Sequence, residues 1–396
     1  MLAIEPEAVA LGDSRGYETE TSKILMRLTA LTSDVLLMFP AAIFALKVIY
    51  PRADRSARLW ALTLVLLHPG LVLIDHGHFQ YNCISLALTA AAVGFVWIDR
   101  WYVGSFFYVL ALNHKHMSLY FALAFFAHLL GEAMRRPTLS KKVTTLASLA
   151  AAVILTFVLA WLPFLRPVGL ALRVLQRLVP IRRGVFEDYV ANFWCVTHVL
   201  VKWKALFEVE SLAKVCALCT LAACAPSVAH QILRTSKKGF LICMLNCSLA
   251  FYLFSYQVHE KSILLPCLPA ALLVLEYPLP SVCFAFISAF SMFPLLVKDG
   301  LVLAYAASLA IFCAFAFLKA EILGPRWLRL GFHASTIVSA CLCALKVGIA
   351  PPQRYPYLFD LFISAFAFAH FSGFFLFWNI ELWKQPGAHQ RQRKRE

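Results

Sequence analysis

The chain has 396 residues, of which 61% are hydrophobic and only 14% are charged, and its mean hydropathy is +0.74. Soluble globular domains carry about 25% charged residues, so this composition excludes an ordinary water-soluble fold and indicates a polytopic membrane protein. The formal net charge of +15 is explained by basic loops on the cytoplasmic side of a membrane, and we expect no nucleic-acid partner.

Apolar stretches long enough to cross about 30 Å of hydrocarbon follow one another along most of the sequence. Because lipid offers the backbone no hydrogen-bond partner, such segments must be helices, and we predict an all-α polytopic membrane protein with about a dozen transmembrane helices. The predicted spans cover residues 24–50, 57–75, 83–99, 101–113, 117–131, 143–165, 211–230, 239–256, 262–276, 281–297, 301–320, 330–349 and 357–383.

The loops between the predicted spans form two groups that alternate along the chain. One group is short and rich in Lys and Arg, which the positive-inside rule assigns to the cytoplasm; it comprises residues 51–58, 99–100, 131–142, 233–239, 319–329 and the C-terminal tail. The other group carries clusters of His, Asp, Glu, Asn and aromatic residues, at 75–82, 113–117, 166–195 and 257–261. We therefore expect one composite polar site on the non-cytoplasmic face.

Residues 68–88 place several polar side chains in one turn between two spans, namely Asp75, His76, His78, Gln80, Tyr81 and Asn82. A solvated loop is the simplest explanation, but such loops usually contain Gly, Ser, Pro and Lys instead. His76 and His78 lack the i, i+4 spacing of a helical metal pair, so we expect no metal. We interpret Asp75, His78, Gln80 and Asn82 as groups that recognise sugar hydroxyls or phosphate.

Two further clusters on the same face carry cations next to carboxylates. Arg183 precedes Glu187 and Asp188, and its guanidinium fork suits a phosphate, although a surface helix with local ion pairs is the alternative. His259, Glu260 and Lys261 form a second cluster between two spans, where ionisable residues are costly and usually functional.

The alternative for the second cluster is that Glu260 and Lys261 only neutralise each other. "NHKHM" (113–117) adds another cationic group on this face, or else a basic side chain that extends to the membrane surface. Taken together, the clusters suit a substrate with a phosphorylated sugar head and a lipid tail.

Four stretches carry a resemblance to a known family: "SRGYETETSKILMRLT" (14–29), "HPGLVLIDHGHFQYN" (68–82), "RGVFEDYVANFWC" (183–195) and "FSYQVHEKSILL" (254–265). In this order they resemble the signature blocks of the endoplasmic-reticulum dolichyl-phosphate-glucose glucosyltransferases, glycosyltransferase family 57, which have the GT-C fold. The last two blocks favour the member that adds the first glucose to Man(9)GlcNAc(2)-PP-dolichol, and the sister enzyme that adds the second glucose is the alternative.

The resemblance implies inverting alpha-1,3-glucosyl transfer from dolichyl-phosphate-glucose on the lumenal side of a multi-pass protein of the endoplasmic-reticulum membrane. Its partners would be that donor, the dolichyl-diphosphate oligosaccharide and membrane lipids, with no cofactor and no metal. The reaction needs a carboxylate base and cations at the departing phosphate. We assign His259, Lys261 and Arg183 to the donor phosphate, and the sugar and acceptor to His78, Gln80, Asn82, Glu187 and Glu260.

The sequence departs from this family at its start. Family members carry an upstream span and a lumenal loop with an acidic "DYPPLTAY"-like motif that supplies the proposed base, and no such motif occurs here. We therefore expect that the first span and first lumenal loop are missing, and we name Asp75 and Asp188 as substitute bases. The expected domains are a polar lumenal N-terminal remnant (1–23), a multi-span domain with lumenal loops (24–383) and a basic cytosolic tail (384–396).

Two other functions stay open from the sequence. A truncated, non-catalytic form that only binds substrate is one, because the base motif is absent. A transporter or lipid scramblase is the other, but transporters typically show internal repeats and ionisable residues deep within spans, whereas here no repeat is visible and the polar residues cluster at one interface.

Overall fold

The computed structural model describes residues 4–9, 16–165, 171–172, 174–175, 189–319 and 324–385, and these residues form helices and turns but no strand. The predicted all-α fold is confirmed. The main helices of the first half are α1 (Glu20–Ser33), α2 (Phe39–Ile49), α3 (Arg55–Leu66), α4 (Pro69–Val72), α5 (Asn82–Trp97), α6 (Trp101–His114), α7 (Ala122–Met134) and α8 (Leu139–Trp161). Those of the second half are α10 (Phe193–Thr197), α11 (Trp203–Leu206), α12 (Val209–Leu233), α13 (Lys237–Phe254), α14 (Leu264–Leu272), α15 (Pro278–Ser291), α16 (Phe293–Lys298), α17 (Val302–Phe317), α18 (Arg326–Gly348) and α19 (Leu358–Trp383).

The described residues contain eight helical segments long and apolar enough to cross a membrane: Glu20–Ile49, Arg55–Gly77, His116–Met134, Leu139–Phe164, Val209–Leu233, Lys237–Phe254, Arg326–Gly348 and Leu358–Trp383. Three shorter apolar helices, α5, α15 and α17, accompany them. The eight segments, α5 and α17 coincide with predicted spans to within a few residues. The predicted span 281–297 differs, because it is divided into α15 and α16 at Met292. The predicted spans 101–113 and 262–276 correspond to α6 and α14, which have 14 and 9 residues and are not among these apolar segments.

Side chains that accept hydrogen bonds from the backbone determine where several helices begin. Asp54, Thr138, Asn192 and Ser236 each accept a bond from the amide three residues later, at distances of 2.5–3.3 Å. This is the usual way in which Asp, Thr, Asn and Ser satisfy the free amides of a first helical turn.

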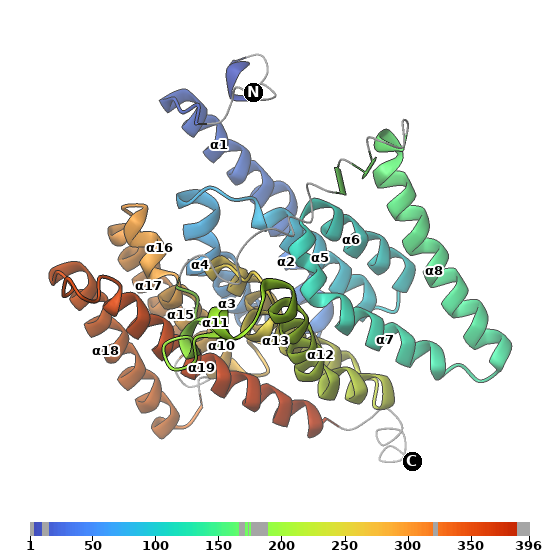
Figure 1. Ribbon diagram of the computed structural model, residues 1–396. Coiled ribbons are helices and arrows are strands. Elements are labelled where there is room, and N and C mark those ends of the chain that lie inside the picture. Colours follow the sequence, from blue (N-terminus) through green and yellow to red (C-terminus); the bar gives the residue numbers. More distant parts are fainter. Residues whose placement is uncertain are drawn as a thin grey trace.

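Helix α13 forms the centre of the bundle, with α7, α12, α14 and α19 packed around it. Of the residues of α13, 78% are buried, whereas only 11% of those in the most apolar stretches of α8 and α18 are buried. Figure 1 shows α8 and α18 at opposite outer edges of the molecule. We infer that α13 contacts protein on all sides, while α8 and α18 present most of their apolar side chains to lipid.

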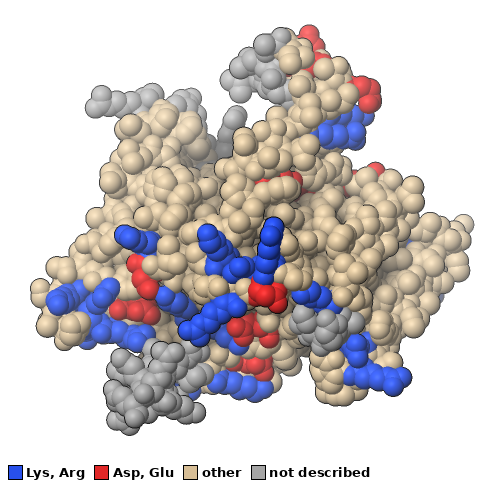
Figure 2. Space-filling view, turned by 180° about the vertical axis from the view of Figure 1, so that it is seen from behind, with Lys and Arg blue, Asp and Glu red and all other residues tan. Residues whose placement is uncertain are grey.

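The helices run back and forth, so that the loops gather at two ends of the bundle. We call one end the basic end; it contains residues 50–54, 98–100, 135–138, 234–236 and 273–277. The other, the site end, contains residues 78–81, Lys115, 255–259 and 299–301. Figure 2 shows Lys and Arg gathered, with Asp and Glu among them, in the lower part of the molecule, where the basic end lies.

Candidate functional site

The site end brings together three sequence clusters that are far apart along the chain. Lys261 Nζ lies 3.1 Å from His78 Nε2, and Lys115 Nζ lies 3.0 Å from Gln80 Oε1. Residues 75–82, 113–117 and 257–261 therefore meet in space. Their placement on one face was predicted from the alternation of the loops, and the geometry agrees with it.

Asp75 lies in the helical turn Leu73–Gly77, where it is buried against the first turn of α5, and both of its carboxylate oxygens accept hydrogen bonds. Oδ1 accepts from Asn82 Nδ2 at 2.7 Å, and Oδ2 accepts from the backbone amide of Cys83 at 2.6 Å. The side chain is 1% exposed. In this arrangement Asp75 anchors the first turn of α5 and sets the orientation of the Asn82 amide.

Asn82 in turn holds Lys115. Its Oδ1 accepts a short hydrogen bond from Lys115 Nζ, and Gln80 Oε1 accepts a second one. Burial lowers the pKa of Lys115, the charge of Asp75 opposes this shift, and the charge of Lys261 adds to it. Lys115 and Lys261 therefore form a pair of neighbouring cations, which is a suitable arrangement for a phosphate.

His78 links Lys261 to a carboxylate that the sequence did not point to, Asp299. His78 Nδ1 lies 2.7 Å from Asp299 Oδ2, while Nε2 faces the Lys261 ammonium. An ammonium only donates and a carboxylate only accepts, so the neutral tautomer with its proton on Nδ1 satisfies both contacts. Through this bond to His78, Asp299 fixes the tautomer and orientation of the ring that contacts Lys261. The other ammonium protons of Lys261 can donate to a ligand.

Helix α1 packs over the turn at residues 78–81. Tyr81 Oη lies 2.9 Å from Thr29 Oγ1, and the Arg27 guanidinium lies over the Phe79 ring at 5.4 Å. Phe79 has a φ of 64°, a left-handed conformation that bulky residues rarely adopt. These contacts hold the turn in a strained conformation, and such strain is often found at functional sites.

The 257–261 segment has a second strained residue, Gln257, with a φ of 58°. Glu260 is 7% exposed, and its Oε2 has no hydrogen-bond partner among the described atoms. Lys261 points to His78, and no Glu260–Lys261 ion pair occurs among the described residues, so the two do not simply neutralise each other. His259 is half-buried next to them.

Several predicted site residues, Arg183, Glu187 and Asp188, lie outside the described residues. The segment that follows them packs against α19. The Tyr189 ring lies 5.4 Å from the Tyr357 ring, and the Tyr189 carbonyl accepts a bond from Ser364 Oγ at 3.3 Å. The roles assigned to Arg183, Glu187 and Asp188 stay predictions.

Two carboxylates, Asp34 and Asp299, were not predicted as site residues from the sequence, and Lys115 was predicted only as part of a cationic group on this face. Asp34 is an acidic residue within an apolar span, which is a signal of function in itself. Asp299 lies between two predicted spans on the face where the polar clusters occur. In the part of the chain that the structure describes, no group of three or more His, Cys, Asp or Glu side chains is arranged to hold a metal ion.

Fold and site together define a polytopic helical membrane protein with Lys, His, Asp, Asn and Gln side chains collected at one end. Its relatives identify it further. The chain belongs to the ALG6, ALG8 glycosyltransferase family, whose model matches residues 1–377. The resemblance found in the sequence to dolichyl-phosphate-glucose glucosyltransferases is thereby confirmed at the level of the family.

Proteins with assigned names match over most of their length. A protein of Arabidopsis thaliana, named probable dolichyl pyrophosphate Man9GlcNAc2 alpha-1,3-glucosyltransferase, is 43% identical over 96% of this chain and 73% of its own. A Drosophila melanogaster protein of the same name is 40% identical, over 96% and 80%. The Gallus gallus dolichyl pyrophosphate Man9GlcNAc2 alpha-1,3-glucosyltransferase is 37% identical, over 98% and 82%.

Proposed function

We propose that the protein transfers glucose from dolichyl-phosphate-glucose to Man9GlcNAc2-PP-dolichol, with an alpha-1,3 linkage and inversion at the anomeric carbon. The names of its relatives support this acceptor and this linkage. The observation that supports the proposal most directly is the convergence of Lys115, His78 and Lys261, with Gln80 and Asn82 beside them. Two ammonium groups suit the donor phosphate, and amides suit sugar hydroxyls.

In this reaction the acceptor hydroxyl forms a bond to the anomeric carbon while the bond from that carbon to the phosphate oxygen breaks. Dolichyl phosphate leaves with an additional negative charge. Lys261 and Lys115 stabilise this developing charge, with His259 as a further donor. We also assign Arg183 to the departing phosphate. Preorganised cations act most strongly here because the site is partly shielded from water.

The acceptor hydroxyl must also lose a proton to a base. Asp75 and Asp188 are our candidates. Asp75 is 1% exposed and both of its oxygens are occupied, which favours a positioning role for it through Asn82. His78, Gln80, Asn82, Glu187 and Glu260 are proposed to bind the glucose and the acceptor sugar.

We further propose that the protein resides in the endoplasmic-reticulum membrane, with the site end in the lumen and the basic end in the cytosol. The excess of Lys and Arg at the basic end supports this orientation. The lipid tails of both substrates then lie in the bilayer beside the helices, while their head groups meet at the site end.

The proposal is tested with the purified protein in liposomes, supplied with dolichyl-phosphate-glucose and Man9GlcNAc2-PP-dolichol. We expect a product that carries one additional glucose, and a loss of roughly 100-fold or more in rate for Lys261→Ala. Lys141→Ala, an exposed residue at the basic end, is the matched control. Transfer only to an acceptor that already carries one glucose would identify the second-glucose reaction instead, and folded protein without any transfer would contradict the proposal.

A further inference from the structure

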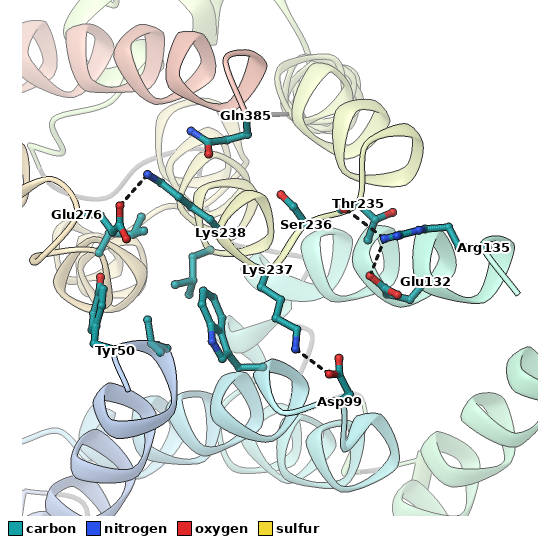
Figure 3. Close-up of a pocket in the computed structure, with 14 residues that line it drawn as sticks. Tyr50, Asp99, Glu132, Arg135, Thr235, Ser236, Lys237, Lys238, Glu276 and Gln385 are labelled. Atoms are coloured by element: carbon teal, nitrogen blue, oxygen red, sulfur yellow. Dashed lines mark hydrogen bonds and ion pairs between the residues drawn. The ribbon is translucent and has the colours of Figure 1, made fainter. Parts of the chain in front are cut away.

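A pocket of about 580 Å³ opens at the basic end of the bundle. Figure 3 shows side chains from many separate elements around it: Tyr50 follows α2, Asp99 follows α5, Glu132 lies on α7, Lys237 and Lys238 begin α13, Glu276 follows α14 and Gln385 follows α19. The uncharged part of its lining is largely apolar and aromatic, with Ile49, Tyr50, Trp97, Leu241 and Leu273. Its volume is in the range of small-ligand sites.

The charged part of the lining consists of three cations and three carboxylates, Arg135, Lys237, Lys238, Asp99, Glu132 and Glu276. They form three ion pairs around the pocket. Lys237 Nζ lies 2.7 Å from Asp99 Oδ2, and Lys238 Nζ lies 2.9 Å from Glu276 Oε2. Arg135 Nη1 lies 3.3 Å from Glu132 Oε1. The pocket is therefore neutral, although the chain as a whole carries a charge of +15.

These ion pairs are open to solvent, so they contribute little to the stability of the bundle. The Asp99 side chain is 59% exposed and that of Glu276 is 44% exposed. Each carboxylate keeps unused acceptor positions and each ammonium keeps unused donors. A ligand with both signs of charge can therefore add hydrogen bonds to every pair without leaving any charge alone.

The end of α5 fixes the position of Asp99 at the pocket. The backbone amides of Asp99 and Arg100 donate hydrogen bonds to the carbonyls of Val96, at 3.1 Å, and Phe95, at 2.9 Å. Asp99 has a φ of 60°, which is the usual left-handed ending of a helix and a conformation that Asp tolerates. The helix end therefore places the Asp99 carboxylate beside Lys237.

We propose that this pocket binds the head group of a zwitterionic phospholipid, which carries one phosphate and one ammonium group. The phosphate contacts Lys237, Lys238 and Arg135, and the ammonium contacts Asp99 and Glu276. An anionic lipid would suit the positive net charge of the whole chain. In this neutral pocket, however, its phosphate would add a negative charge beside three carboxylates, with no ammonium group to balance it. The apolar and aromatic part of the lining, at the ends of membrane spans, favours a lipid over a soluble compound.

The test measures thermal unfolding of the full-length protein after delipidation in detergent. Phosphatidylethanolamine, phosphatidylcholine and phosphatidylglycerol with identical acyl chains are compared, together with soluble glycerophosphoethanolamine. We expect at least one zwitterionic lipid to raise the unfolding temperature by about 2 °C or more above the value with phosphatidylglycerol. Equal effects of all lipids, or a larger effect of phosphatidylglycerol, would overturn the proposal, and so would an effect confined to the soluble compound.

A double variant makes the test specific to the pocket. Asp99→Asn/Glu276→Gln leaves two uncompensated cations, so phosphatidylglycerol should bind at least threefold more tightly than either zwitterionic lipid. Glu208→Gln/Glu210→Gln changes the net charge equally at exposed positions at the start of α12, and it should keep the wild-type order. If the first variant does not fold, Lys237→Gln/Lys238→Gln decides the question, because it should weaken binding of the zwitterionic lipids at least threefold. Wild-type preferences in either pocket variant would refute the assignment.

Discussion

His76 Nε2 lies 2.6 Å from Asp34 Oδ2, and this contact joins two membrane spans at the site end. Both residues occupy π-helical turns, Asp34–Met38 and Leu73–Gly77, each within a longer helical segment. Such turns are rare and frequently occur at functional sites. The pairing gives the Asp34 carboxylate a partner within an apolar segment and fixes the helical turn that carries Asp75.

Removal of the Asp34 charge should therefore destabilise the protein. We expect Asp34→Asn to lower the free energy of unfolding by about 1.5–3 kcal/mol, the usual contribution of a hydrogen bond to a charged group. Thermal unfolding in detergent measures the change. Glu20→Gln, at an exposed position of the same helical segment, should change the stability by less than about 0.5 kcal/mol. Equal stability of the two variants would show that the Asp34–His76 contact contributes nothing.

Asp299 acts in our proposal as a positioning residue, through His78. Asp299→Asn removes the carboxylate that keeps the His78 proton on Nδ1, so Nε2 no longer reliably accepts from Lys261. We expect a fall of roughly 10-fold in kcat/KM with dolichyl-phosphate-glucose, comparable to the loss of an outer-sphere partner elsewhere. The ¹⁵N chemical shifts of His78 should report the change of tautomer. A slower variant with an unchanged tautomer would mean that Asp299 acts by another route.

The lowered pKa of Lys115 leads us to expect that donor binding depends on pH. Burial lowers the pKa of Lys115 below its ordinary value of 10.5, so this side chain loses its charge at a lower pH than an exposed lysine. As pH rises through that pKa, KM for the donor should increase. Lys115→Arg stays protonated, so the increase attributable to this position should disappear. KM measured from pH 7 to 10 for both proteins checks this, and identical profiles would exclude Lys115 as the titrating group.

The effect of pH on stability has the opposite sign to its effect on donor binding. In the pH range between the lowered pKa of Lys115 and 10.5, the unfolded chain binds more protons at this position than the folded protein does. The contribution of Lys115 to the free energy of unfolding should therefore rise with pH over that range, while substrate binding declines.

Two glycines predict opposite effects of the same substitution. A Cβ at Gly104 would lie 2.6 Å from Val96 Cγ2 and 3.0 Å from the Ala92 carbonyl oxygen, where α6 packs closely on α5. Gly104→Ala should lower the free energy of unfolding by about 1–3 kcal/mol. Gly373 lies inside α19, and apart from the adjacent backbone of its own helix no atom comes within 4 Å of such a Cβ, so Gly373→Ala should raise the free energy of unfolding by about 0.5–1 kcal/mol. Unfolding temperatures that shift in the same direction would contradict the packing described for α5 and α6.

Much of this fold could be predicted from the sequence because lipid imposes a simple rule. Apolar length determines the spans, and the alternation of basic and His-rich loops determines which ends gather together. For this reason residues 75–82, 113–117 and 257–261 could be assigned to one face from the sequence alone.

The individual partners could not be predicted in this way. The pairs His78–Asp299 and His76–Asp34 depend on how far each helix is rotated about its axis, and hydropathy carries no information on that rotation. Glu260 and Lys261 show the same difficulty, since adjacent opposite charges suggested a local pair while Lys261 contacts His78. The pocket at the basic end is formed by many separate helix ends, and no local sequence pattern indicates it.

The buried position of α13 has a mechanical consequence for the surrounding bilayer. With 18 residues, α13 is about 27 Å long, and the candidate active site and the proposed lipid pocket lie at its two ends. α8 and α18, with 23 residues each, are longer, lie at the edge of the bundle and bury few of their apolar residues. When the thickness of the membrane varies, these peripheral helices tilt to accommodate the mismatch. The central helix keeps the two polar regions at a constant separation.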